Sequence, residues 1–493
     1  MDADWRGLDW LVPDSMVPVS IVPVWMDAEL RAFAEAKETD RTPVSRLSVN
    51  RKIFRAAAAV TAAGMLVKIV ATLKEFVVAG VFGLSDGMDA FLIAFLVPNL
   101  MVNLLAESMN QALIPTFVRV RETEGEGPAR SLLHSAMAWT SLLLVGGSLA
   151  MALAARWVLP LVASHFSPAK LLLTERLFYG LLPIVVIAGI ASNCTAMLNT
   201  LERFAWPAVA PVTAPLLVMV SAWLAATTIG MRLGIWALVW GSVAGAGVHA
   251  ALTVWMMETH GYPLRVRWEG MTTAAREVAG QYGPVMLSGL VASGGLLVDQ
   301  GMAASLAPGS VSTLVYANRF VNVAANLLAG AIATAVTPYI SQMVARRDWA
   351  GCRHTLNTYV RLMAMVSVPL AVLMVLGSRW LIQMTFQHGA FSARDTAAVA
   401  PVQAMYAVQL PFFVVSRVYY RYLVAIRRTG LILWCGAINL VLDVILNLVL
   451  MRWLGVAGIA LATSLWTVST LGFLAYWSYR LLPPPEKAIE AAV

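Results

Sequence analysis

The sequence predicts an all-α polytopic membrane protein, with about twelve transmembrane helices in two six-helix lobes around a central cavity. The chain of 493 residues is 59% hydrophobic and 13% charged, and its mean hydropathy is +0.73. Apolar runs long enough to cross a bilayer as helices recur along it, and its two halves resemble each other. The short alternating segments of a transmembrane β-barrel do not occur in the sequence.

Twelve spans follow a charged N-terminal segment. Residues 1–52 are interrupted by Pro13, Pro18 and Pro23, and their apolar patch is too short to span and lacks a basic n-region. We therefore expect a largely disordered cytoplasmic tail rather than a signal peptide. The predicted spans are 54–80, 88–117, 131–161, 173–198, 207–229, 233–257, 279–306, 311–343, 356–386, 395–424, 430–451 and 454–479.

Basic residues are more numerous on one side of these spans than on the other. With the N-terminus inside, the cytoplasmic segments hold Arg51, Lys52, Arg119, Arg121, Arg130, Arg265, Arg267, Arg346, Arg347, Arg353, Arg427 and Arg428. The opposite loops are short, and their main basic residues are Lys170, Arg232, Arg394 and Arg452. Because basic residues favour the cytoplasmic side, we expect both termini, including residues 481–493, in the cytoplasm.

The two halves form an internal repeat. "ALIPTFVRVRE" at the end of span 2 resembles "AVTPYISQMVARR" at the end of span 8, which aligns Pro115 with Pro338. The offset of roughly 220 residues covers six spans, and an even number of spans keeps the orientation, so the repeats are parallel. This predicts lobes at 53–257 and 279–480, joined by a cytoplasmic linker at 258–278. Such a plan favours a transporter with its site between the lobes.

Charged residues inside span 1 support a polar interior. Lys68, Lys74 and Glu75 lie within "LVKIVATLKEFVVAG". One charge at the centre of a spanning helix costs roughly 2.5–3.5 kcal/mol on insertion scales. These residues therefore face water or a partner inside the helix bundle, provided that the segment spans the membrane. Glu75 is a candidate charge partner or gating residue.

Span 2, "DAFLIAFLVPNLMVNLLAESMNQALIP", carries a second polar stripe. Asn99, Asn103 and Glu107 recur every four residues, and Asp89 lies five turns before Glu107 on the same face. The two acids are candidates for gating or for structural ion pairs. The asparagines are candidates for headgroup contacts, although such stripes also hold helices together.

The second half adds three charged candidates. Arg319 in span 8, with Lys68 and Lys74 from the other lobe, predicts a cationic cavity for an anionic headgroup, because three cations cannot neutralise one another. Asp299 in span 7 and Asp443 in span 11 are candidates for ion coupling, and Asp443 also for a salt bridge.

Several function classes are disfavoured. The sequence has no phosphate-binding glycine loop, no nucleophile elbow and no metal-ligand cluster, so we expect neither an enzyme nor a bound cofactor. Transport would draw on a Na+ or H+ gradient or on the membrane potential. The net charge of +8 reflects cytoplasmic loops rather than nucleic-acid binding. Cys194, Cys352 and Cys435 are scattered and predicted to be packing residues.

One family resembles most of this chain. "KIVATLKEFVVAGVFGLSDGMDAFLIAFLVPNLMVNLLAESMNQALIPTF" is similar to the first two spans of the MurJ/MviN lipid II flippase family. "VYANRF" and "FQHGAFSARDT" resemble other stretches of that family, and the similarity extends over residues 54–480. The family belongs to the multidrug/oligosaccharidyl-lipid/polysaccharide exporter superfamily, which has two six-helix lobes.

The resemblance implies a function and a set of site residues. It implies a flippase in the bacterial inner membrane that moves an undecaprenyl-pyrophosphate-linked saccharide to the outer leaflet by alternating access. Lys68 and Lys74 match cavity arginines of the family and Arg319 matches a third, while Asp89, Asn99 and Glu107 match acidic and amide positions. The partners would be that lipid, membrane lipids and enzymes of envelope synthesis.

The sequence also departs from the family pattern. Val102 and Asn103 stand where the motif has an arginine, and Lys74-Glu75 replaces an Arg-Asp pair. The family usually has fourteen spans, whereas about twelve are expected here. Lipid II and an exopolysaccharide repeat unit therefore both remain candidate substrates. The alternatives are an ion-coupled multidrug antiporter, which would need an acidic cavity, and a non-transporting scaffold.

Overall fold

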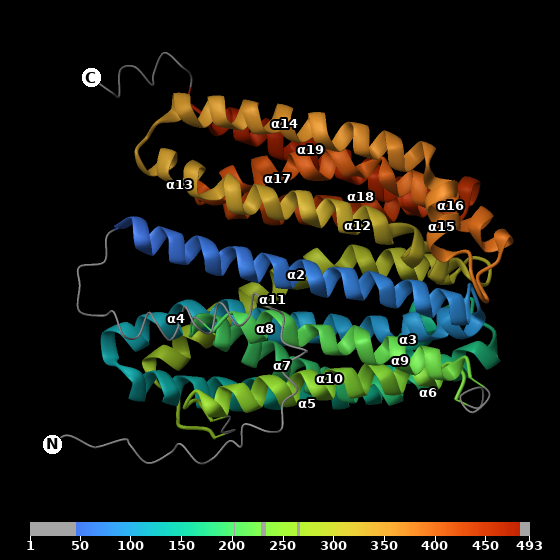
Figure 1. Ribbon diagram of the computed structural model, residues 1–493, viewed down its shortest axis with the longest axis horizontal. Helices are drawn as coiled ribbons and strands as arrows, with labels where there is room; N and C mark the ends of the chain where they lie inside the picture. The colour runs from blue at the N-terminus through green and yellow to red at the C-terminus, as the bar shows by residue number, and fades with distance from the viewer. Residues whose placement is uncertain (1–45, 202, 228–232, 264–266, 484–493) are drawn as a thin grey trace. The chain divides into compact units, whose positions relative to one another are not determined.

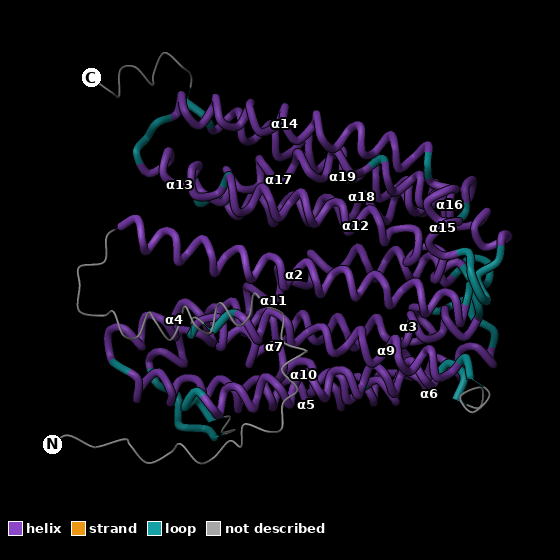
Figure 2. Tube along the Cα trace, viewed as in Figure 1, coloured by secondary structure: helices purple, strands orange, loops and turns teal. Residues whose placement is uncertain are grey.

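The computed structural model describes residues 46–201, 203–227, 233–263 and 267–483 (Figure 1). The predicted tails 1–52 and 481–493 lie almost entirely outside these residues. The described residues from Val60 onwards form one compact unit, to which the following description applies. Figure 2 shows helices joined by short loops throughout the described part.

The helices of the first half correspond to predicted spans 1–6. They are α2 (Arg46–Phe82), α3 (Asp86–Val102), the π-helix η1 (Asn103–Glu107), α4 (Ser108–Glu124), α5 (Glu126–Val162), α6 (Pro168–Leu181), α7 (Pro183–Thr200), α8 (Ala205–Val209), the 3₁₀ helix η2 (Ala210–Val212), α9 (Thr213–Ala225) and α10 (Trp236–Thr259). Span 2 is thus divided into α3, η1 and α4, although Pro98 lies inside α3 without ending it.

The helices of the second half correspond to spans 7–12. They are α11 (Thr273–Ala304), α12 (Ser310–Ala335), α13 (Thr337–Ala345), α14 (Trp349–Leu376), α15 (Ser378–Phe386), α16 (Ala393–Ala407), α17 (Gln409–Ala425), α18 (Thr429–Leu454) and α19 (Val456–Leu481). Helix α11 begins inside the predicted linker 258–278, six residues before the predicted span, where Thr272 caps its first turn.

Eleven helical runs among the described residues are long and apolar enough to cross a membrane. They match predicted spans 2–12, and α2 corresponds to span 1. Helices α3–α10 pack on one another, and α12–α19 form a second group. Helix α11 contacts both groups, through α4 and α5 on one side and α18 and α12 on the other (Figure 1). The fold is therefore all-α with two lobes, as predicted.

Small residues allow the close packing of α9 on α10. A Cβ built on Gly245 would lie 2.6 Å from the Cα of Ala214, and one on Gly241 would lie 2.9 Å from the Cα of Val218. Such a small-xxx-small spacing lets the two backbones approach, which in lipid replaces the hydrophobic drive for helix association. These two glycines therefore fix the distance between α9 and α10.

Hydrogen bonds and ring packing hold the loop after α10 against α5. The Glu269 carboxylate accepts hydrogen bonds from Ser131 and His134, and the Glu269 amide donates to Ser135 Oγ at 3.2 Å. The bonds from Ser131 and His134 hold the pKa of the Glu269 carboxyl below its usual range. The indole of Trp268 packs on Trp139, with ring centroids 5.9 Å apart. This loop thus enters α11 from a fixed position on α5.

Gly245→Leu should disrupt the lobe formed by α3–α10, because its side chain would have to displace the α9 backbone. We expect the melting temperature in detergent to fall by about 5–10 °C, measured by fluorescence-detected gel filtration after heating. Gly247→Leu is the matched control, since a Cβ there meets nothing within 4 Å. Equal melting temperatures for the two variants would contradict this packing.

Candidate functional site

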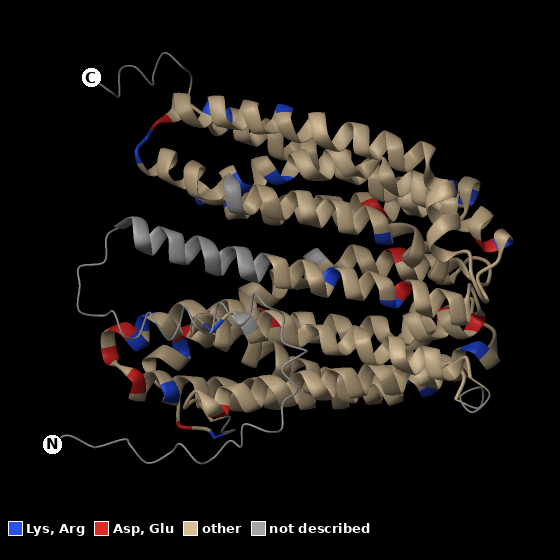
Figure 3. Ribbon diagram, in the orientation of Figure 1, with Lys and Arg blue, Asp and Glu red and all other residues tan. Residues whose placement is uncertain are grey.

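Charged groups gather mainly at the two ends of the helices, and few lie along the middle (Figure 3). One end is where α2 finishes, α3 begins and the α11–α12 and α15–α16 loops lie, at the right of Figure 1. At this end, polar and backbone groups of the two lobes meet. We refer to Asp89, Lys170, Gly309 and Ser312 there as the interlobe latch.

Asp89 is the centre of the interlobe latch. Its side chain is 1% exposed and accepts hydrogen bonds from the Gly309 amide at 2.7 Å, the Ser312 amide at 2.9 Å and Ser312 Oγ at 2.8 Å. These amides belong to the first turn of α12, where unpaired N–H groups and the helix dipole favour an anion. A carboxylate of the first lobe therefore caps a helix of the second.

Lys170 balances the charge of Asp89. Its ammonium lies 3.0 Å from Asp89 Oδ2 and 2.6 Å from Asp86 Oδ1, and 4.2 Å from the ring centroid of Phe166. Lys170 is 9% exposed, so this is a buried ion pair rather than a surface one. Removing either partner would leave an uncompensated charge.

Glycines bring backbones of the two lobes together beside the interlobe latch. The Ala390 amide donates to the Gly80 carbonyl at 2.6 Å, and the His388 ring contacts the Phe76 carbonyl at 3.1 Å. Gly389 has φ of +60°, and a Cβ there would lie 2.2 Å from the Gly80 oxygen. Only glycine fits this joint without displacing α2.

Glu75 brings together the charged candidates of both lobes. Its carboxylate lies 2.8 Å from Lys74 Nζ and 3.9 Å from an Arg319 guanidinium nitrogen. Glu75 is 8% exposed, while both cations are partly exposed. Glu75 thus contacts both of these cations, and we refer to the three residues as the Glu75 cluster.

Lys68 lies two turns before Glu75 on α2, about 10 Å away along the helix axis. Its side chain is exposed, and no ion pair joins it to another residue of the described part. Of the three predicted cavity cations, Lys68 is thus the one without a carboxylate partner there. Its charge is available to an anion.

Asn99, Asn103 and Glu107 of span 2 lie on an exposed face, whereas Asp89, predicted on the same face, is buried at the interlobe latch. Asn99, Asn103 and Glu107 are all exposed, and Glu107 accepts a hydrogen bond from Ser192 at 2.8 Å. Asn103 and Glu107 are the first and last residues of the π-helix η1, and π-helices are frequent at functional sites. Exposed amide and carboxylate groups within a spanning helix usually face water rather than lipid.

Asp299 and Asp443 belong to a separate polar cluster inside the second lobe. Asn447 Nδ2 donates to Asp299 Oδ1 at 2.8 Å and to Asp443 Oδ1 at 3.2 Å, and Thr463 donates to Asp299 Oδ2 at 3.3 Å. Both carboxylates are buried, and Asp443 Oδ2 and Asn447 Oδ1 have no hydrogen-bond partner among the described residues. Carboxylate, amide and hydroxyl oxygens of this kind are suited to a hard cation.

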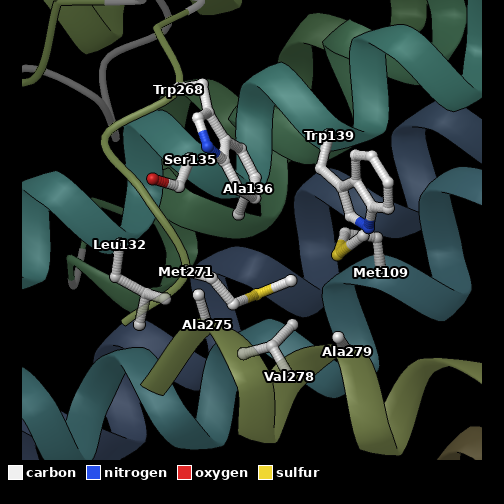
Figure 4. A pocket seen from close by; sticks show the side chains of 10 residues that line it. All are labelled: Met109, Leu132, Ser135, Ala136, Trp139, Trp268, Met271, Ala275, Val278 and Ala279. Carbon is white, nitrogen blue, oxygen red and sulfur yellow. The ribbon is translucent and has the colours of Figure 1, made fainter. Parts of the chain in front are cut away.

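A further pocket lies between α4, α5, α11 and the loop before α11 (Figure 4). Its lining comprises Met109, Leu132, Ser135, Ala136, Trp139, Trp268, Met271, Ala275, Val278 and Ala279. None of these residues is charged, and none belongs to the Glu75 cluster. This apolar pocket is therefore not suited to an anionic headgroup.

Two lobes of membrane-length helices joined by a polar latch, with cations from both lobes beside it, define an all-α polytopic membrane protein. The comparisons with known proteins then identify the family. The chain belongs to the MurJ family, whose model, described as "Lipid II flippase MurJ", matches residues 78–490. The resemblance seen in the sequence is confirmed.

Similar proteins include the probable lipid II flippase MurJ of Rhizobium meliloti, 26% identical over 444 residues, covering 85% of this chain and 81% of that protein. The lipid II flippase MurJ of Burkholderia cenocepacia is 26% identical over 376 residues, and the match covers 73% of this chain and 70% of that protein. A solved lipid II flippase MurJ in an inward closed conformation has a TM-score of 0.73 at 21% identity, covering 86% and 88%. An inward-facing multidrug transporter of the superfamily has a TM-score of 0.73 at 12% identity, covering 89% and 100%. The structural likenesses establish the fold.

The structure brings together Lys74, Glu75 and Arg319, and it places Asp89 at the interlobe latch. It keeps Asp299 and Asp443 apart from both, within the second lobe. The sequence analysis missed Lys170, which was assigned to a loop, and also Gly309 and Ser312. The glycines in "FGLSDG" and "FQHGAF" were the sequence signal for tight turns at this end. In the structure, Gly83 and Gly389 adopt positive φ, which glycine tolerates.

Asp89→Asn should open the interlobe latch, because it removes a buried charge that holds two amides, a hydroxyl and Lys170. The loss of these contacts should destabilise the closed interlobe latch by about 2–4 kcal/mol. The melting temperature in detergent, measured by fluorescence-detected gel filtration after heating, reports on this loss. We expect it to fall by about 5–10 °C.

Asp86→Asn is the control for this measurement. Asp86 contacts Lys170 but its side chain is 60% exposed. The melting temperature should then stay near that of the parent, because surface ion pairs contribute little. An Asp89→Asn protein that melts at the same temperature as the parent would contradict the role of the interlobe latch.

Proposed function

We propose that this protein moves a lipid-linked saccharide carrying a diphosphate from the cytoplasmic to the outer leaflet by alternating access. The relatives are named lipid II flippases, which makes lipid II the leading substrate. The observation that carries the proposal is the convergence of Lys74 and Arg319, one from each lobe, on Glu75.

The Glu75 cluster supports diphosphate binding. Arg319 lies 3.9 Å from Glu75, which is too long for a hydrogen bond, so its fork of N–H donors remains available. A diphosphate offers more acceptor oxygens and more charge than one carboxylate. We propose that the diphosphate replaces Glu75 as the partner of Arg319 and Lys74. Lys68, two turns away on α2, adds a further positive charge.

The interlobe latch supports alternating access. It consists of hydrogen bonds and one ion pair, which can break and form again without exposing a large apolar face. Helix α12 is the member of the second group that packs on α3. We propose that the latch closes the outer side while the opposite end admits substrate from the inner leaflet, with both termini in the cytoplasm.

The Asp299–Asp443 cluster supports ion coupling. It lies within one lobe, so a bound Na+ or H+ would change the packing of α11 against α18 and α19 rather than contact the headgroup. Asp299, Asp443, Asn447 and Thr463 would hold the ion, which would supply positive charge between the two carboxylates. Helix α11 would transmit this change in packing to the first lobe, because it contacts both lobes.

One observation favours a second substrate. Asn103 stands where the family motif has an arginine, and it is exposed on the π-helix η1. An amide in place of a cation there favours a headgroup with less negative charge or with more sugar hydroxyls. An exopolysaccharide repeat unit on the same lipid diphosphate is therefore the second candidate.

Mass spectrometry of undecaprenyl-linked intermediates after depletion tests the function. We expect lipid II to accumulate. If a different lipid-linked oligosaccharide accumulates while lipid II is unchanged, the second substrate is correct. Unchanged levels of all such lipids would contradict the flippase proposal and favour drug efflux.

Alanine variants of Lys68, Lys74 and Arg319 should each lower complementation and lipid flipping at least tenfold while the protein still accumulates. Each removes a charge-assisted contact worth about 1.5–3 kcal/mol. Lys68→Arg should retain activity, since charge is kept. Arg452→Ala, at an exposed helix end, is the control. Full activity in all three alanine variants would exclude a diphosphate site at the Glu75 cluster.

Asp299→Asn and Asp443→Asn should each uncouple transport from the ion gradient, since each removes one charge from the buried pair. Flipping in proteoliposomes should lose its dependence on an imposed Na+ or H+ gradient. Asp395→Asn, which affects only the capping of α16, is the control. Gradient dependence that persists in both variants would exclude this cluster as the coupling site.

A further inference from the structure

A cationic and aromatic stripe occupies one face of α17. Its members recur at helical spacing and are Phe413, Arg417, Tyr420, Arg421 and Val424, which we call the α17 stripe. The first four are half-buried and Val424 is 36% exposed, whereas Val414, Val418, Tyr419 and Tyr422 on the other faces are buried. The described helices therefore leave this face of α17 accessible.

The aromatic rings hold the two guanidinium groups in place. Arg417 lies 4.3 Å from the ring centroid of Phe413 and 5.7 Å from that of Tyr420, and Arg421 lies 5.8 Å from the latter. Stacking on an aromatic face orients a guanidinium and leaves its edge free. It does not neutralise the charge or use up the five N–H donors.

The described part of the chain supplies no carboxylate to this stripe. Residues 310–483 contain thirteen arginines and three aspartates. Asp348 caps α14, Asp395 caps α16, and Asp443 is buried beside Asn447. Among the described residues, no hydrogen bond or ion pair involves the side chain of Arg417 or Arg421. Two preoriented guanidinium groups thus have no anionic partner in that part of the chain.

The depth of the stripe matches a lipid headgroup. Helices α16 and α17 together run for 33 residues, about 50 Å, which exceeds the hydrocarbon core of roughly 30 Å. Arg417 lies about 12 Å and Arg421 about 6 Å from the C-terminal end of α17. Arg319, in contrast, lies about 14 Å from the latch end of α12. The stripe is therefore distinct from the Glu75 cluster.

We propose that Arg417 and Arg421 bind the phosphate of an anionic phospholipid in the leaflet at the α13 end of the bundle. Charge complementarity carries the assignment: a phosphodiester is the anion at that depth, and guanidinium forks match its oxygens bidentately. Phe413, about 6 Å deeper in the bilayer than Arg417, borders the upper acyl chain. This binding is independent of the substrate proposed above.

Native mass spectrometry of the purified full chain tests the proposal, with phosphatidylglycerol compared against phosphatidylcholine of the same chains. We expect the parent protein to retain phosphatidylglycerol preferentially. Arg417→Gln with Arg421→Gln should lower the retained phosphatidylglycerol at least fivefold and leave phosphatidylcholine unchanged. Arg394→Gln with Arg452→Gln, at the opposite end, is the matched control and should retain the parent level.

Three outcomes would overturn the proposal. They are an unchanged phosphatidylglycerol signal in the Arg417/Arg421 variant, an equal loss of both lipids, and a loss of undecaprenyl diphosphate binding with phosphatidylglycerol retained. The last would assign the stripe to the substrate route. If the double variant does not accumulate, Arg421→Gln alone, nearer the helix end, gives the same comparison.

Discussion

The capping of α12 by Asp89 is the interaction on which the arrangement of the two lobes depends. A single carboxylate accepts hydrogen bonds from the first turn of a helix in the other lobe and is neutralised by Lys170. Buried ion pairs contribute little net stability, but they specify geometry because each partner has one satisfactory arrangement. Here that geometry determines where α12, and therefore Arg319, lies relative to α2.

The Glu75 cluster follows from this geometry. Arg319 lies about two and a half turns beyond Ser310 on α12. It reaches Glu75 because the first turn of α12 is held at Asp89 while the Gly80–Ala390 contact holds α2. Phe76, Phe320 and Phe386 pack together beside the charges, with ring centroids 5.0–5.9 Å apart. A substrate that binds at Glu75 would therefore act close to the contacts that keep this end closed.

Much of the fold was predictable, because helix length and hydropathy are local properties. The spans, the repeat and the charged face of α2 all appear in the sequence. Glu75 was a candidate charge partner in the sequence, but its contact with Arg319 was not predictable, because it depends on the position of a helix more than 200 residues away. Lys170 follows Pro168 at the start of a helix, so it resembled a loop residue, and only the tertiary structure turns its side chain towards α3. The helix breaks at Val336, Gly377 and Val408 were also missed, since the apolar pattern continues through them.

The π-helix at Asn103–Glu107 has a consequence for the way this chain can change. A π-helix holds one residue more than an α-helix over the same turn. Deleting a residue there would restore α-helical winding with little rotation of α4 relative to α3, because the extra residue is taken up within the turn. An alignment of relatives that lack the π-helix would therefore need a one-residue gap at this point. The extra residue also shifts by one position the residues of α4 that fall on a given face of span 2, relative to an uninterrupted α-helix.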